Sequence, residues 1–275
     1  MNKSILRALK RVWILNFIRR VTYATSYFNS KYGQILSWGF QSNEDTNYTY
    51  HLTESNKDYL AQLLAHILQS DYATIRGYIA EIENDQVLRQ HIQTGIAQSG
   101  LARFADQDIR YGKRLGWYAV VRALKPKIVV ETGVDKGLGS VVLAAALLKN
   151  KEEGFNGQFY GTDINPEAGY LLSGAYQSVG KILYGDSIET LSKMTDKIDF
   201  FINDSDHSAD YEYREYQIIK DKLSDNAIIL GDNAHVTDKL SRFSIEHNRE
   251  FLYFQEQPKN HWYPGAGNGF SFTRR

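Results

Sequence analysis

The chain has 275 residues, of which 43% are hydrophobic, and its 32 basic and 32 acidic residues leave a formal net charge of zero. It contains no cysteine, which excludes disulfides and thiolate metal sites and agrees with a reducing, cytoplasmic compartment. No apolar run reaches the ~18 residues of a membrane span, and Lys and Arg interrupt the first twenty positions too often for a signal-peptide core.

The charge is unevenly distributed along the chain. Residues 1–43 contain seven basic residues and no acid, so residues 44–275 carry −7. Apolar residues recur at helical spacing from Ile5 to Val21, which predicts a basic amphipathic helix. This helix either packs on the protein or on a second copy in a homodimer, or lies on an anionic membrane surface through residues 1–25. The acidic remainder of the chain argues against nucleic acid as a partner.

Residues 44–105 are predicted to form polar helices without a catalytic constellation. Thr53 is placed to cap the first helix, and Ser70 or Asp71 the second. We expect a lid or a dimerisation layer here. A further helix, 111–124, ends at Pro126. The chain is therefore expected to comprise a helical N-terminal region, 1–105, and a ligand-binding domain, 106–275.

Residues 127–140, KIVVETGVDKGLGS, read as a buried strand, a glycine turn and a helix start. Glycines let the backbone approach a ligand closely, and the helix start presents unpaired N–H groups. Glu131 would repel a pyrophosphate but suits an ammonium or sulfonium group. An ordinary strand-to-helix turn has the same pattern, so the glycines alone leave both interpretations open.

From Ile128 onward, predicted strands alternate with helices, which is typical of an α/β fold with helices on both faces of a parallel sheet. Asp163 ends the second strand, where it can accept hydrogen bonds from ribose hydroxyls or cap a helix that starts at Asn165. Asp186 and Ser187 follow the third strand and can bind an adenine amino group or cap the next helix.

Two more polar clusters end the fourth and fifth strands, at residues 203–207 and 231–235. Every such cluster lies at the carboxyl end of a strand, where open α/β sheets bind ligands.

These residues resemble the S-adenosylmethionine-dependent methyltransferases of the Rossmann-like class, over residues 106–275. The resemblance implies a seven-stranded sheet with a last antiparallel strand, formed here by 251–254 and 269–273. It also implies S-adenosylmethionine as cofactor, bound by Glu131, Thr132, Gly133, Gly137, Gly139, Ser140, Asp163, Ile164, Asp186, Ser187 and Asp204.

Within that class the chain is most similar to the metal-dependent O-methyltransferases, which include catechol, caffeoyl-CoA and macrocin-type sugar enzymes. Asp232 and Asn233 match a pair of metal ligands in these enzymes, and 204–207 matches the segment with the third ligand and the base. The resemblance implies Mg²⁺, or Ca²⁺ or Mn²⁺, bound by Asp204, Asp232 and Asn233, which are hard oxygen ligands.

His207 and Asp206 compete as the catalytic base. In the catechol branch the position of His207 holds a lysine, and in some sugar-modifying relatives the position of Asp206 serves. We favour His207, because its unperturbed pKa lies near working pH. Asn203 leaves open a shift of register in which Asp206 binds the metal.

The acceptor is expected to be a small molecule or sugar hydroxyl, methylated with help from the metal. Candidate substrate contacts are His235, Asp238, His261 and Trp262. Two alternatives stay open: a nicotinamide-dependent oxidoreductase on a Rossmann sheet, and a binding protein that keeps the cofactor pocket without turnover.

Overall fold

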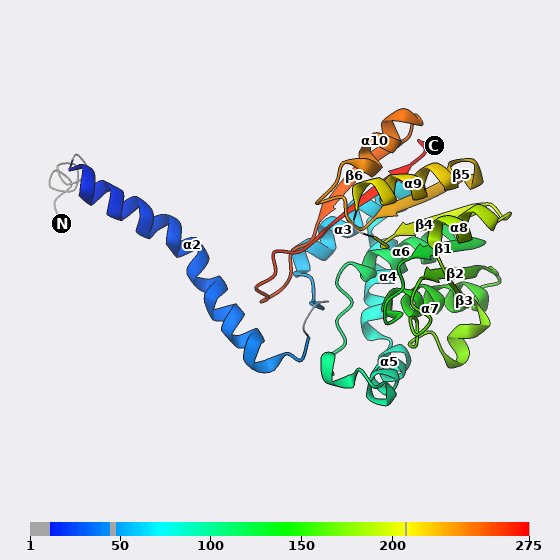
Figure 1. Ribbon diagram of the computed structural model, residues 1–275, viewed down its shortest axis with the longest axis horizontal. Helices are drawn as coiled ribbons and strands as arrows, with labels where there is room; N and C mark the ends of the chain where they lie inside the picture. The colour runs from blue at the N-terminus through cyan, green and yellow to red at the C-terminus, as the bar shows by residue number, and fades with distance from the viewer. Residues whose placement is uncertain (1–11, 45–47, 207, 275) are drawn as a thin grey trace. The chain divides into compact units, whose positions relative to one another are not determined.

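The computed structural model describes residues 12–44, 48–206 and 208–274 (Figure 1). Contacts divide the chain into two compact units, one of residues 1–43 with 260–263 and the other of residues 44–259 with 264–275. The helical residues 54–98 therefore share a unit with the sheet.

The first unit consists mainly of one helix, α2 (Trp13–Gln41), which has no buried residue. With 3.6 residues per turn, most of its large apolar side chains fall on one face, and Leu15, Tyr23, Tyr27 and Phe40 lie outside it. The exposed side chains of this apolar face are Trp13, Ile14, Phe17, Ile18, Val21, Phe28, Tyr32, Ile35 and Leu36. Arg19, Ser26 and Ser30 lie on the opposite face. The predicted amphipathic helix is thus present from Trp13 onward, and its first residues lie outside the described ones.

Segment 260–263 packs along α2 within this unit. Lys31 Nζ donates to the carbonyl oxygen of His261 at 3.0 Å. The rings of Trp38 and Trp262 meet edge to face, with centroids 5.4 Å apart. No helix in the described ranges is long and apolar enough to cross a membrane.

The larger unit is built on a seven-stranded sheet in the order β3-β2-β1-β4-β5-β7-β6 (Figure 1). Strands β1 to β5 are parallel, and β7 runs antiparallel to β5 and β6. The strands are β1 (Ile128–Thr132), β2 (Gln158–Asp163), β3 (Gly180–Tyr184), β4 (Ile198–Asn203), β5 (Leu223–Gly231), β6 (Glu250–Gln255) and β7 (Gly267–Phe272). The predicted fold class, including the antiparallel last strand, is confirmed.

Helices cover both faces of this sheet. One group is α3 (Glu54–Leu68), α4 (Tyr72–Asn84), α5 (Gln86–Gln98), α6 (Arg114–Leu124) and α7 (Leu138–Glu152). The other is α8 (Ser187–Lys193), α9 (Ala209–Ile219) and α10 (Lys239–Glu246). Three 3₁₀ turns, η1 (Ala102–Phe104), η2 (Gly174–Ser178) and η3 (Lys220–Lys222), lie in the connections.

Successive strand residues face opposite sides of the sheet. Val130, Phe201 and Ile229 pack against α8, α9 and α10 in one core cluster. Their neighbours Val129 and Phe200 are also fully buried and point to the other face. Because both faces are covered, the parallel strands are continuous apolar runs, which made them predictable.

The helices of the first group begin at capping side chains. Thr53 accepts from the backbone N–H of Asn56, and Asp71 from that of Thr74. The predicted cap at Thr53 is confirmed, and the structure selects Asp71 from the two candidates for the second helix.

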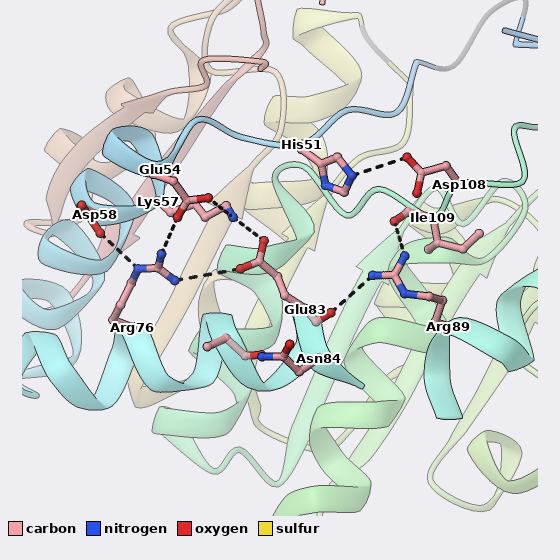
Figure 2. A network of polar contacts seen from close by, with 11 residues as sticks. His51, Glu54, Lys57, Asp58, Arg76, Glu83, Asn84, Arg89, Asp108 and Ile109 are labelled. Carbon is pink, nitrogen blue, oxygen red and sulfur yellow. Dashed lines mark hydrogen bonds and ion pairs between the residues drawn. The ribbon is translucent and has the colours of Figure 1, made fainter. Parts of the chain in front are cut away.

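A network of ion pairs joins α3 to α4 (Figure 2). Arg76 contacts Glu54 at 2.8 Å and Asp58 at 3.1 Å. Lys57, whose side chain is only 7% exposed, lies between Glu54 and Glu83. The guanidinium of Arg89 on α5 donates to the carbonyl oxygen of Ile109 at 3.0 Å. These contacts anchor the segment that leads into α6.

The helix expected after Asp163 is not formed, because residues 166–171 are turns. The backbone N–H of Gly169 donates to the carbonyl of Asp135 at 2.7 Å, and that of Leu171 to the carbonyl of Lys136 at 3.1 Å. These N–H groups therefore bind the glycine turn after β1 instead of an i−4 carbonyl.

Candidate functional site

The turn after β1 is pressed against the ends of β2 and β4. Gly133 has φ +78°, and a Cβ there would lie 2.0 Å from the carbonyl oxygen of Asp204. The N–H of Gly133 donates to Thr162 at 2.9 Å, and the N–H of Asp204 donates to Thr132 at 3.0 Å. Glycine is required here both by its backbone conformation and by the close approach of β4.

Glu131 is buried beneath the start of α7. Its Oε2 accepts from the Ser140 hydroxyl at 2.7 Å. A Cβ on Gly139 would lie 2.1 Å from its Oε1, so the missing side chain makes room for the carboxylate. Burial raises the pKa of Glu131 to about 7. Gly137, with φ +90°, starts the helix against Gly169.

Asp163 holds the same turn in place. Its Oδ2 accepts from the N–H groups of Val134 at 3.0 Å and Asp135 at 2.9 Å, and its Oδ1 from that of Asn165 at 2.8 Å. A carboxylate has about four acceptor sites, so a ribose hydroxyl can still be accommodated. The side chain of Ile164 is 79% exposed beside it.

Asp186 and Ser187 make structural bonds at the start of α8. Asp186 accepts from the N–H of Glu189 at 3.1 Å and from the Tyr211 hydroxyl at 3.1 Å. The Ser187 hydroxyl donates to Glu215. Asp186 thus caps α8, as one of its two interpretations predicted, and adenine binding stays a prediction.

Glu215 on α9 joins the strand ends, and the sequence reading missed it. This fully buried carboxylate accepts from the hydroxyls of Thr132 and Ser205, each at 2.9 Å, and from the side chains of Ser187 and Asn203. Burial raises its pKa to about 7. Its helical spacing from Glu212 and Ile219 indicated the buried face.

Asp204 and Asp232 converge, as predicted, but around a lysine. Lys113, just before α6, hydrogen-bonds Asp232 Oδ2, and its Nζ lies 3.7 Å from Asp204 Oδ2. The three side chains are 15%, 6% and 16% exposed, respectively. The cluster is therefore a buried group of two carboxylates and one ammonium.

Protonation is divided unequally within this cluster. Burial, together with the neighbouring Asp232, raises the pKa of Asp204 well above its ordinary value. Burial also acts to raise the pKa of Asp232, but the Lys113 ammonium outweighs it and lowers that pKa. Burial acts to lower the pKa of Lys113, but the two carboxylates outweigh it and raise that pKa. Ionised Asp232 therefore pairs with Lys113.

Asp204 and Asp232, two of the three predicted metal ligands, do not fit a divalent cation while Lys113 contacts both. A cation bridging Asp204 and Asp232 would lie against an ammonium of the same sign. Asn233, the third predicted ligand, is buried, and its backbone carbonyl accepts from the N–H groups of Val236 and Thr237 at 2.8 and 3.0 Å, so a metal role for its side chain stays a prediction. Among the described residues, no three His, Asp or Glu side chains are grouped to hold a metal ion.

The remaining predicted residues are spread over several segments. Asp206 is exposed and accepts from the N–H of Ser208 at 2.8 Å, ahead of α9. His207 lies outside the described residues. His235 and Asp238 are exposed in the loop between β5 and α10. His261 and Trp262 belong to the unit of α2. Substrate contact by any of them stays a prediction.

Lys113 is the second residue that the sequence reading missed. It precedes Arg114 at the positive end of a helix, where a cation is unfavourable. Two basic residues in that place indicate a compensating acid from elsewhere in the chain. The partner, Asp232, is 119 residues away, so the sequence could not name it.

Comparison with known proteins shows what this geometry is similar to. Residues 130–234 match a family model described as a methyltransferase domain. No curated protein matches the chain. The O-methyltransferase TomG from Streptomyces achromogenes, solved with SAM, is similar in structure at a TM-score of 0.50 and 12% identity, over 70% of this chain and 91% of its own. An O-methyltransferase from Bacillus cereus, solved with SAH, has a TM-score of 0.50 and 13% identity, over 80% of this chain and 99% of its own.

The predicted resemblance to methyltransferases agrees with this match, and the two solved structures share the fold. The matched region spans the glycine turn, Asp163, Asp186 and the ends of β4 and β5. Over residues 130–234 the chain is therefore similar to a methyltransferase domain.

The close approach of Gly133 to Asp204 can be tested by substitution. Gly133→Ala adds a methyl group 2.0 Å from a backbone oxygen at φ +78°, whereas Gly154→Ala, at φ +90°, meets nothing within 4 Å. We expect the control to cost about 1–2 kcal/mol of backbone strain and Gly133→Ala clearly more, measured by urea unfolding. Equal losses would show that β4 does not constrain the turn.

Proposed function

We propose that the protein transfers a methyl group from S-adenosylmethionine to a hydroxyl of a small molecule or sugar. The observation that carries this proposal is the buried Glu131 under a glycine turn that lies directly against Asp204 at the end of β4. The carboxylate of Glu131 suits a cationic amino acid group. At the end of β4, Asp204 supplies a second acid. The match to a methyltransferase domain supports the same class.

The reaction needs positioning above all. The oxygen of the acceptor forms a bond to the methyl carbon as the carbon–sulfur bond breaks, and that electron pair stays on sulfur. The hydroxyl proton passes to a base. Asp206 and His207 follow β4 and are the candidates for that role. Because Asp204 and Asp232 enclose Lys113, no step in this proposal runs through Mg²⁺ or another divalent cation.

The two similar structures support the cofactor and the reaction type. TomG is described as an O-methyltransferase in complex with SAM, and the Bacillus cereus enzyme as an O-methyltransferase in complex with SAH. The oxidoreductase alternative is disfavoured, because antiparallel β7 and an acid at the end of β1 do not suit a dinucleotide site.

A screen of hydroxyl-bearing acceptors tests this function. We expect S-adenosylhomocysteine release that depends on one acceptor class, followed by mass spectrometry of the methylated product. With that acceptor, His207→Ala or Asp206→Ala should reduce kcat by ~10²–10⁴, whichever is the base. Slow release that no acceptor accelerates would favour the binding-protein alternative, and binding of NAD(H) instead of S-adenosylhomocysteine would favour the oxidoreductase.

Glu131 gives the cofactor affinity a defined pH dependence. Below its pKa of about 7, the carboxyl must lose a proton before it can face the ammonium of S-adenosylhomocysteine. Affinity should therefore rise with pH, about eightfold between pH 6 and 7.5, measured by calorimetry. Glu131→Gln keeps the acceptor for Ser140 and should bind more weakly with a flat profile. If the affinity of Glu131→Gln rose with pH as steeply as that of the parent, Glu131 would not be the titrating group.

We further propose that α2 brings the enzyme to an anionic membrane surface. Residues 1–43 carry seven basic residues and no acid, so two copies would repel while an anionic surface attracts. The apolar face of α2 is exposed, with Trp13 at 75% and Phe28 at 62%. This combination suits an interfacial helix.

Vesicle flotation distinguishes an anionic membrane from a second copy of the chain as the partner of the apolar face of α2. We expect binding to phosphatidylserine-containing vesicles that salt weakens, and little to pure phosphatidylcholine. Phe17→Ser with Phe28→Ser should abolish it, whereas Ser26→Ala with Ser30→Ala on the opposite face should not. A homodimer by light scattering that the Phe variant splits, without vesicle binding, would instead assign the face to a second copy.

A further inference from the structure

Lys113 has bonding capacity that the described residues do not use. An ammonium has three donors, and among the described residues Lys113 hydrogen-bonds only Asp232, since Asp204 lies 3.7 Å away. The second oxygen of Asp232, Oδ1, is buried and has no partner among the described residues. Unpaired buried groups are costly, so this cluster is suited to receive a polar ligand.

The cluster adjoins the cofactor turn on two sides. Asp204 is the residue whose carbonyl oxygen prevents any side chain at Gly133. Lys113 Nζ lies 5.6 Å from the ring centroid of Trp117, and a Cβ on Gly139 would lie 2.6 Å from that same ring. Lys113 therefore shares one neighbour with each of the two glycines that shape the turn, Asp204 with Gly133 and Trp117 with Gly139, where the methyl donor is proposed to bind.

We propose that Lys113 is a catalytic residue that takes the place of a divalent cation, binding the acceptor oxygen and stabilising the negative charge that develops on it. The proposal rests on the methyltransferase function proposed above. Asp232 holds the ammonium through Oδ2, and its buried Oδ1 accepts a second donor of the acceptor molecule. An ammonium is compact and positively charged, which suits it to hold one oxygen.

The transfer step balances without a metal. The acceptor oxygen, held by an N–H of Lys113, bonds to the methyl carbon, and the sulfonium leaves as neutral S-adenosylhomocysteine with the electron pair of the broken bond. The hydroxyl proton goes to the base that follows β4. Lys113 keeps its own proton throughout and contributes electrostatic stabilisation in a site largely shielded from water.

The competing explanation is that Lys113 is only a structural ion pair. Lys57 provides a matched control, because it is another buried lysine between two carboxylates, Glu54 and Glu83, outside the proposed site. Lys57→Met should lower the thermal midpoint and leave kcat unchanged. Lys113→Met should retain S-adenosylhomocysteine affinity and lose about 10²–10³ in kcat, the loss typical of one oxyanion donor. Lys113→Arg, which keeps the charge, should lose less.

Turnover with the acceptor found above and Mn²⁺ titration followed by electron paramagnetic resonance complete the test. We expect parental turnover to survive metal stripping and EDTA, with no stoichiometric Mn²⁺ bound. Lys113→Met at full kcat would overturn the proposal, as would one bound Mn²⁺ that Asp232→Asn removes. The Mn²⁺ titration needs no turnover. It therefore tests whether Lys113 occupies the place of a metal even if no acceptor is methylated and the methyltransferase proposal is lost.

Discussion

The burial of carboxylates at the carboxyl ends of the parallel strands is the constraint on which the rest of the larger unit depends. Glu131, Glu215 and Asp232 are almost without solvent contact. A carboxylate taken out of water is tolerated only where hydrogen bonds or an opposite charge compensate it. Ser140 donates a hydrogen bond to Glu131, and four side chains donate to Glu215. The Lys113 ammonium pairs with Asp232. The chain around the strand ends is arranged to supply these partners.

Tyr50 and the start of α3 contribute to this balance from outside the sheet. The Tyr50 hydroxyl donates at 2.7 Å to Glu256, a buried carboxylate whose pKa is raised to about 7 by burial and lowered in part by Lys113. The Asn56 amide donates to the Gln255 carbonyl at 3.0 Å, which ties α3 to the end of β6. The segment expected to be a lid or a dimerisation layer thus also supports the acid cluster.

Much of the fold could be predicted from the sequence, because strands covered on both faces are apolar runs followed by polar residues. The turn at 166–171 was missed because its N–H groups bind the loop after β1, a long-range contact that local propensity cannot show. The convergence of Asp204 and Asp232 followed from strand order. Lys113 did not, because no local pattern links a lysine before α6 to the end of β5.

The acids at the strand ends show why a capping role and a ligand role are not exclusive. Asp163 holds the turn with three backbone bonds, and Asp186 accepts from a backbone N–H and from Tyr211. Such bonds fix a carboxylate before a ligand arrives, which reduces the entropy lost on binding. Thr162 Oγ1 and Asn203 Oδ1 at the neighbouring strand ends are nevertheless buried without a partner among the described residues. Asp232 Oδ1 is likewise a buried acceptor without a partner in the described part of the chain, and it belongs to the carboxylate that binds the Lys113 ammonium. Under the proposed function, a donor group of the methyl acceptor would satisfy this oxygen, so that the acid cluster contributes to the choice of acceptor.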